Sequence, residues 1–149
     1  MPFWMRPLLN SSTLGGRQMS YDISLYDRGF LKRAIESNLG DWTDADPIEA
    51  SAAERLIAIA TDAGFRRVPS DPAFVEFCRE QGVAPVEELL LETPEILAQL
   101  SLHRGQLAFT IPYSPLAQAS IALCSMLARL VAQEHHLAFY DPQEGVAEY

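Results

Sequence analysis

The C-terminal half of the chain constrains the fold most, because it contains two alternating apolar runs separated by a short turn. Apolar residues recur at every second position over 96–102 and again over 107–113, and Arg104-Gly105 lies between the two runs. Alternation with period two is typical of a strand that buries one face. The two runs therefore predict a β-hairpin.

A long apolar helix and a last strand follow this hairpin. The helix pattern extends over about 115–135 and contains Arg129 and Glu134 as its only charged residues. Such a helix must be covered on much of its circumference. Residues 137–140 then form an apolar strand, and Asp141-Pro142 ends it because proline offers no amide hydrogen to a sheet.

The N-terminal half begins with a strand and continues with a short helix. Residues 21–26 alternate apolar and polar side chains, which predicts the first strand. Asp27 is placed to cap a helix that extends to about Leu39, and Gly40 is expected to end it. The expected inner face of this helix consists of Phe30, Leu31, Ala34 and Ile35.

Two further helices are expected before the hairpin. Asp46, Pro47 and Glu49 form a capping box, which predicts a helix from there to about Ala63, with Gly64 as the stop. The next helix opens at Ser70, Asp71 and Pro72, ends near Gly82, and directs Phe74, Phe77 and Cys78 inward. For residues 83–93, Pro85 and the glutamates favour a helical turn, although the three successive leucines are also compatible with a strand.

The order of elements is strand, several helices, strand, strand, helix, strand. This order matches the ferredoxin-like split β-α-β-β-α-β plan, an α+β fold with an antiparallel four-stranded sheet and, here, extra helices in the first crossover. In that plan the hairpin's first strand and the final strand are the two edges. Exposed edge strands predict a homodimer or a partner that adds a strand.

The charge of the chain excludes some partners. The formal net charge is −9, and because Arg6 and Arg17 both precede Met19, the sequence from Met19 onward carries nine of the 11 basic residues and all 20 acidic ones. An acidic protein of this kind is not expected to bind nucleic acid or an anionic membrane. No pattern indicates a cofactor or a metal.

Residues 1–18 have the character of an extension or a tail, and residues 19–149 are expected to form a single α+β domain. The leader contains two arginines and no acid, but its apolar run is short and interrupted by Pro2 and Pro7, so it is a poor signal peptide. No window approaches the length of a transmembrane helix. The expected location is the cytoplasm.

Four carboxylates, those of Asp41, Asp44, Asp46 and Glu49, occur within nine residues. The order of residues in a calcium-binding EF-hand loop is missing here, and two of these acids are assigned to the helix cap. The cluster is therefore interpreted as a solvated acidic loop. If the chain binds a protein, these are the charges expected to steer the encounter.

The segment Tyr140-Asp141-Pro142-Gln143 is the second candidate. One interpretation is strand termination alone. The other is that Asp141 and Gln143, together with Trp42 and Tyr113, form a polar and aromatic rim that a partner recognises.

Catalytic patterns are weak. Ser125, Cys124 and His103 are unlinked in sequence, and no pair of the acidic residues is singled out as an acid and base. His135 and His136 are adjacent, so they point in different directions and do not form a metal pair on one helical face. Cys78 and Cys124 are expected to be small buried apolar residues, with a disulfide or a reactive thiol as the alternative.

The two ends of the domain carry a resemblance. Met19-Ser20-Tyr21-Asp22-Ile23 and the closing LAFYDPQEG resemble a loose set of small bacterial proteins, some of which are similar to immunity proteins that neutralise toxins of secretion or contact-dependent systems. The resemblance transfers no functional residue to this chain. It implies a role in binding another protein.

The sequence therefore predicts a non-enzymatic bacterial protein that neutralises a partner, such as a basic toxin or effector, through its acidic surface. The residues expected to contact the partner are Asp41, Trp42, Asp44, Asp46, Glu49, Tyr113, Asp141 and Gln143. A regulatory module, or one that binds a small molecule on the sheet face or in a dimer cleft, is the alternative, and an enzyme whose site is assembled from separated residues is the third.

Overall fold

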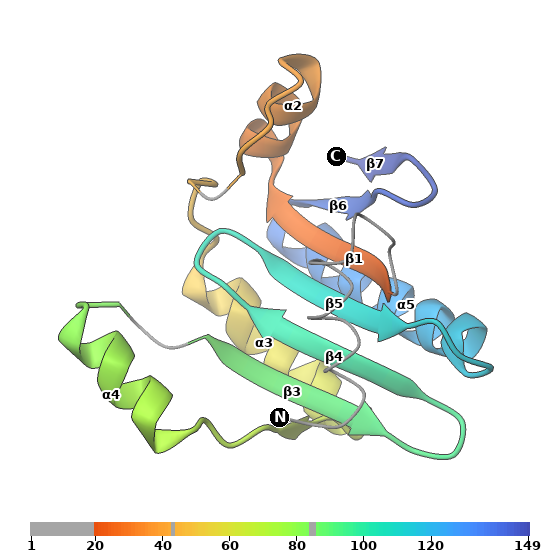
Figure 1. Cartoon of the computed structure of the whole chain (residues 1–149). Coiled ribbons are helices and arrows are strands. Elements are labelled where there is room, and N and C mark those ends of the chain that lie inside the picture. The colour runs from red at the N-terminus through yellow and green to blue at the C-terminus, as the bar shows by residue number, and fades with distance from the viewer. Residues whose placement is uncertain (1–19, 43, 84–85) are drawn as a thin grey trace.

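The computed structural model of the chain describes residues 20–42, 44–83 and 86–149 (Figure 1). Within these ranges the fold is mixed α+β, with four helices and an antiparallel sheet of seven strands. The helices are α2 (Arg28–Glu36), α3 (Ala50–Asp62), α4 (Pro72–Glu80) and α5 (Ala117–His135). The strands are β1 (Ser20–Asp27), β2 (Arg66–Arg67), β3 (Glu87–Glu92), β4 (Leu97–Leu102), β5 (Leu107–Pro112), β6 (Leu137–Asp141) and β7 (Val146–Glu148).

The order of strands in the sheet is β2-β3-β4-β5-β1-β6-β7. The four strands expected from the sequence are neighbours at its centre, and the predicted hairpin is confirmed by the β4–β5 pairing. The prediction of a four-stranded sheet is wrong, because β3 pairs with β4 and β7 pairs with β6. The two strands predicted to be edges are therefore covered, and β2 and β7 form the edges instead.

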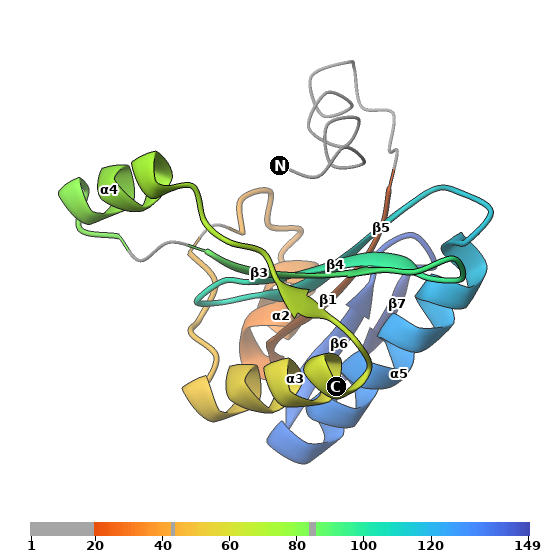
Figure 2. The same cartoon turned by 90° about the horizontal axis from the view of Figure 1, so that it is seen from below.

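One face of the sheet is covered by α3 and α5, which lie side by side beneath it in Figure 2. The main core lies between these helices and the apolar residues of β1, β3, β4, β5 and β6. Leu25, Leu100 and Val131 are fully buried there, and Phe65 packs edge-on against Phe109 with ring centroids 5.8 Å apart. The apolar side chains at alternate positions of the strands thus face the apolar sides of the helices.

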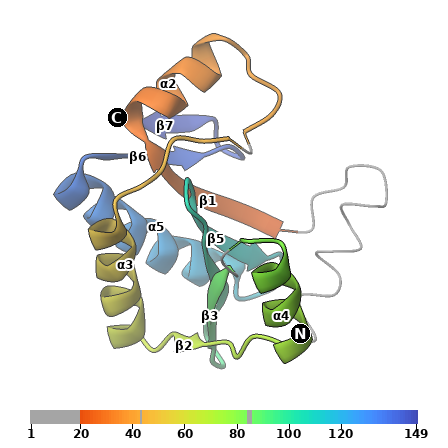
Figure 3. The ribbon, with the colours of Figure 1, turned by 90° about the vertical axis from the view of Figure 1, so that its left-hand side faces the viewer.

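The opposite face of the sheet is only partly covered. At one end, Phe30, Leu31 and Ala34 of α2 pack against Tyr26 and Ala138, and this is the smaller of the two apolar clusters. Figure 3 shows α2 beside β6 and β7, at the end of the sheet far from β3. The central part of this face carries polar side chains, and we call it the open face.

Helix α2 follows the prediction at its start but not at its end. The Asp27 side chain accepts a hydrogen bond of 3.0 Å from the backbone N–H of Phe30, as expected for a cap. The helix ends before Gly40, and the left-handed residue is Asn38, with φ 49°. Ile35, expected on the inner face, is 41% exposed.

The start of α3 corrects a prediction. The helix begins at Ala50, its N-cap is Glu49, and no side chain caps it. The predicted capping box is not formed, because the helix starts three residues later than expected, and the Asp46 carboxylate forms an ion pair with Arg33. The end at Gly64, with φ 109°, is confirmed, because this backbone conformation favours glycine.

Helix α4 begins as predicted, with the Asp71 side chain accepting from the N–H of Ala73 at 2.9 Å. Its packing does not follow the prediction. Cys78 is the only buried residue of α4, whereas Phe74 and Phe77 are 48% and 58% exposed. In Figures 1 and 2 the helix projects from the sheet, away from α3 and α5.

The helical turn preferred for residues 83–93 is also wrong for most of the segment, because residues 87–92 form β3. Pro85 lies outside the described residues, as do the leader 1–18 and Met19. Beyond β6, the chain turns at Pro142 and adds β7, a strand that the sequence did not indicate.

Candidate binding surfaces

The acidic segment, by which we mean Asp41, Asp44, Asp46, Glu49 and the described residues between them, borders a groove of about 830 Å³. We call it the acidic groove, because Asp44, Asp46 and Glu87 line it together with a single arginine, Arg104. The remaining lining residues are mostly apolar and come from three places in the chain: Ala45, Pro47, Ile48, Ala50, Ala53 and Ile57 around the start of α3; Val83 and Val86 before β3; and Leu102, His103, Gly105 and Leu107 around the β4–β5 turn. Apolar walls with acidic groups suit a segment that is both apolar and basic.

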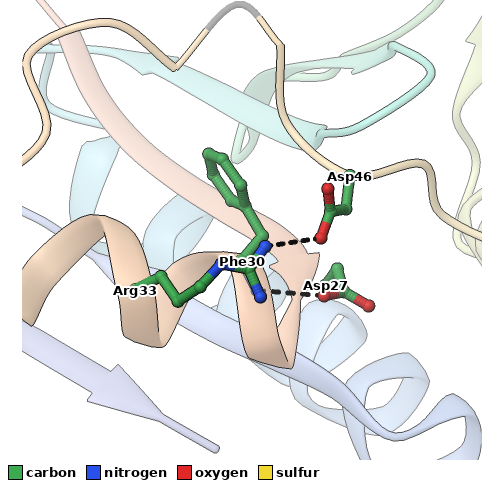
Figure 4. A network of polar contacts seen from close by, with 4 residues as sticks. All are labelled: Asp27, Phe30, Arg33 and Asp46. Carbon is green, nitrogen blue, oxygen red and sulfur yellow. Dashed lines mark hydrogen bonds and ion pairs between the residues drawn. The ribbon is translucent and has the colours of Figure 1, made fainter.

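The four acids of the cluster occupy different environments. Asp41, Asp44 and Glu49 are exposed. Asp46 is half-buried, and its carboxylate lies 2.7 Å from the Arg33 guanidinium (Figure 4). Figure 4 also shows the Asp27 cap of α2 beside this pair, so the ion pair links α2 to the acidic segment. Arg33 thus already provides a counter-charge for the Asp46 carboxylate.

The β4–β5 turn holds the acidic segment in place. The N–H of Ile48 donates a hydrogen bond of 2.9 Å to the backbone oxygen of Arg104. Ala45 lies directly against Gly105. The position of Asp44 and Asp46 at the groove therefore depends on contacts between two backbone segments that are distant in the sequence.

An apolar surface lies on α4, the helix that precedes the groove residue Val83. Phe74 and Phe77 are one helical turn apart on α4, and Val75 beside them is 38% exposed. Val83, which is 58% exposed, follows α4 and lines the groove. We call Phe74, Val75 and Phe77 the α4 apolar face. The sequence did not reveal this surface, because apolar residues at helical spacing are found both on core-facing and on exposed sides of a helix.

Trp42 is not an exposed rim residue. It is half-buried against Tyr26, Phe30 and Tyr140, with ring centroids 5.3, 5.9 and 5.5 Å away. Its indole N–H donates a hydrogen bond of 2.7 Å to the backbone oxygen of Leu39. The aromatic cluster therefore fixes the segment that leads from α2 to the acidic loop.

Asp141 and Gln143 turn toward the sheet. The Tyr21 hydroxyl donates a hydrogen bond of 2.5 Å to the Asp141 carboxylate, which is buried and also accepts from the N–H of Glu144. Gln143 Oε1 accepts from the N–H of Asp22 at 2.6 Å. Both side chains thus attach the β6–β7 turn to β1. Of the four rim residues, Tyr113 is the one that is largely exposed.

The open face of the sheet carries a second groove, of about 310 Å³, which sequence analysis missed. We call it the open-face groove. Its lining residues are mainly polar and come from β1, β4, β5, β6 and the adjoining turns: Asp22, Ser24, Tyr26, Ser101, His103, Gln106, Ala108, Thr110, Tyr140 and Pro142. The polar residues at alternate positions of β1 are the sequence feature that could have indicated this groove, but such residues usually lie on a face that is exposed to solvent.

A hydrogen-bonded trio forms one wall of the open-face groove. Gln106 Nε2 donates to the Tyr26 hydroxyl at 2.7 Å and to the Ser24 hydroxyl at 3.2 Å. Burial raises the pKa of Tyr26, and the hydrogen bonds with Ser24 and Gln106 partly oppose that shift. Burial also raises the pKa of Asp22, and a hydrogen bond with Thr110 partly opposes it.

The catalytic and metal candidates are not brought together. Cys78 and Cys124 are free and buried, as expected, and burial raises the pKa of the Cys124 thiol to about 12, which makes it unreactive. In the described part of the chain, no group of three or more His, Cys, Asp or Glu side chains is placed to hold a metal ion. His103 lies at the β4–β5 turn, where it lines both grooves.

Comparison of the chain with protein-family models, with curated proteins and with solved structures finds no match. The resemblance to immunity proteins therefore stays a prediction from the two end motifs. Within the described ranges, no helix combines the length and the apolar character that crossing a bilayer requires.

Proposed function

We propose that this chain is a bacterial protein that binds and neutralises a basic protein partner, in the manner of an immunity protein. The proposed contact surface consists of the acidic groove and the α4 apolar face. The observation that carries the proposal is the exposure of Phe74 and Phe77 on α4, the helix that precedes the groove residue Val83.

Exposed aromatic residues on a projecting helix favour a binding role. Leaving a phenylalanine side chain in water forgoes about 1.5–3 kcal/mol of the free energy that its burial would contribute. Two such residues on one helical face form an apolar patch of the kind that marks interaction sites. Large aromatic side chains at the centre of an interface supply much of its binding energy.

The charge of the groove favours a basic partner. Asp44, Asp46 and Glu87 line it, and Glu49 lies beside it. Asp46 is paired with Arg33 and Glu87 with Arg67, and Arg104 also lines the groove, so the attraction for a basic partner comes from Asp44 and Glu49 and from exchange of these exposed ion pairs. The net charge of −9 adds long-range attraction for a cationic protein. Such complementarity raises the association rate and makes it sensitive to salt.

The order of the inner strands, β4-β5-β1-β6, supports a ferredoxin-like plan for this part of the sheet, with β2, β3 and β7 added outside it. A homodimer through an edge strand is the alternative mode of association. It is less favoured, because the edge strands β2 and β7 contain two and three residues, and short edges offer few free backbone groups. The partner is therefore expected at the groove and α4.

The test is affinity capture from the lysate of the bacterium that produces the protein, followed by binding kinetics with the purified partner. Phe74→Ser combined with Phe77→Ser is expected to weaken the affinity by at least about 100-fold, as for two residues at the centre of an interface. The matched control is Met126→Ser with Leu130→Ser, which removes two exposed apolar residues of α5. This control is expected to bind normally.

Charge neutralisation tests the acidic groove separately. Asp44→Asn, Asp46→Asn and Glu49→Gln together are expected to slow association by about tenfold at low salt and to flatten its salt dependence. Asp62→Asn, Glu92→Gln and Glu95→Gln remove the same charge from exposed positions elsewhere. Equal effects of the two triple variants, together with an unchanged affinity of the phenylalanine variant, would overturn the proposed surface.

A further inference from the structure

We propose that the open-face groove binds a small molecule that carries a primary ammonium group, with Asp22 as the anion that receives it. This inference is independent of the protein partner proposed above, because Asp22 and the hydroxyl groups that it invokes lie outside the acidic groove, which shares only His103 with the open-face groove among the described residues. It rests on the lining of the groove, on a half-buried carboxylate without a cation, and on two buried hydroxyl groups in the wall.

Asp22 is the principal observation. Its side chain lies on the open face, where it faces Thr110 of the neighbouring strand. None of the ion pairs among the described residues includes Asp22. No lysine or arginine lines the groove, His103 is the basic residue among its lining residues, and Thr110 compensates the carboxylate in part through a hydrogen bond. A half-buried carboxylate that lacks a cation is poorly compensated, so a bound cation would supply what the fold does not.

The neighbouring trio adds hydrogen-bonding groups that suit an ammonium ion. Ser24 and Tyr26 are 4% and 6% exposed, and both residues line the groove. Because Gln106 donates to both through its amide nitrogen, its carbonyl oxygen is left as an acceptor. A primary ammonium group has three donors, and the carboxylate, the amide oxygen and the hydroxyl oxygens offer acceptors for them.

The dimensions and charge of the groove narrow the chemical class of the ligand further. A volume of about 310 Å³ lies at the small end of ligand sites, so a single small molecule fits and a protein segment does not. The ring of Tyr140 and Pro142 provide an apolar side for a short aliphatic chain. An anionic ligand would meet Asp22, and the net charge of −9 also disfavours it. A short aliphatic amine is the class that remains.

The experiment is a titration of the full-length, isotopically labelled protein with putrescine, followed through backbone amide signals at constant ionic strength. The neutral analogue 1,4-butanediol is the matched ligand control. Putrescine is expected to bind with a Kd of about 1 mM or tighter and to shift the amide signals of Asp22, Ser24, Thr110 and Tyr140. Butanediol is expected to leave these signals unchanged.

Two substitutions make the result specific. Asp22→Asn is expected to weaken putrescine binding by about tenfold or more, since a charge-assisted hydrogen bond is lost. Tyr26→Phe, which keeps the ring and removes the hydroxyl, is expected to weaken it by a few-fold, whereas Asp44→Asn removes an acid of the other groove and should have no effect. Absence of saturable shifts, equal shifts with butanediol, or equal binding by wild type and Asp22→Asn would each overturn the proposal.

Discussion

Gly105 lies so close to Ala45 that a Cβ atom on Gly105 would be 2.7 Å from the Ala45 backbone oxygen and 2.8 Å from its Cβ. Real Cβ atoms do not approach backbone atoms this closely. The β4–β5 turn can therefore support the acidic segment only if position 105 has no side chain. The hydrogen bond from Ile48 to Arg104 holds the same two segments together from the adjacent position.

Gly105→Ala is expected to lower the free energy of unfolding by about 1–3 kcal/mol, because the added methyl group must displace the backbone of Ala45. Gly40→Ala is the control, since a Cβ there meets nothing within 4 Å. It should change stability by less than about 0.5 kcal/mol. Urea denaturation of the two variants measures the difference. Equal stabilities would show that the contact between the two segments contributes nothing.

The second prediction concerns the buried pair Tyr21 and Asp141. Tyr21→Phe removes the donor and leaves the buried Asp141 carboxylate with one fewer hydrogen bond. We expect a loss of about 1–3 kcal/mol, as for a buried charged group that loses a partner. Tyr113→Phe, at an exposed tyrosine, should leave the urea midpoint unchanged. A stable Tyr21→Phe variant would mean that Asp141 finds another donor.

The third prediction concerns the titration of the tyrosines at alkaline pH. Burial raises the pKa of Tyr21, the hydrogen bond to Asp141 raises it further, and burial also raises the pKa of Tyr26. The folded state thus holds these protons more tightly than the unfolded state does. Their contribution to stability is complete below the ordinary tyrosine pKa of about 10 and is lost as the pH rises above it.

The absorbance of tyrosinate in the native protein should therefore show late-titrating groups, and each of Tyr21→Phe and Tyr26→Phe should remove one of them. The unfolded protein in urea is the reference, because all its tyrosines should titrate together near pH 10. If native and unfolded titration curves coincide, the two hydroxyls are not buried as described.

The inner strands and the long helix could be predicted because their sequence patterns are strong and local. Alternation in β1, β4 and β5 specifies which side faces the core, and the apolar run of α5 indicates a long helix. The expected cover on much of the circumference of α5 is wrong, because Met126 and Leu130 are 60% and 41% exposed. The outer strands could not be predicted in this way. β7 has three residues and β2 has two, so their existence depends on pairing with β6 and β3 rather than on any pattern of their own.

The candidate site residues could be predicted only in part, because contacts between segments that are distant in the sequence decide the environment of each side chain. A sequence shows that Asp46 can cap a helix, but it does not show that Arg33 lies 2.7 Å from that carboxylate in the folded chain. It also shows that Phe74 and Phe77 share a helical face, but not whether another element covers them. Asp141 and Asp22 are both acids at strand positions, and only the fold places one under Tyr21 and the other in a groove.

The fourth prediction concerns Asp22. Burial raises its pKa, so the folded state favours the protonated carboxyl more than the unfolded state does. The contribution of this protonation to the free energy of unfolding is fully present below the ordinary aspartate pKa of about 3.9. It is lost as the pH rises through that value toward the folded pKa. At pH 7 the fold therefore carries an unfavourable charge at this position. Replacing the residue by asparagine removes that charge and retains a polar group opposite Thr110.

Asp22→Asn is expected to be more stable than the wild type at pH 7, and the gain is expected to shrink as the pH is lowered toward about 4. Urea denaturation at several pH values measures both trends, with Asp44→Asn as the control for loss of an exposed acid. A gain that does not depend on pH would point to packing rather than charge. A loss of stability at pH 7 would contradict the prediction. An acid that costs stability in the folded state is the pattern expected where a side chain serves binding rather than folding.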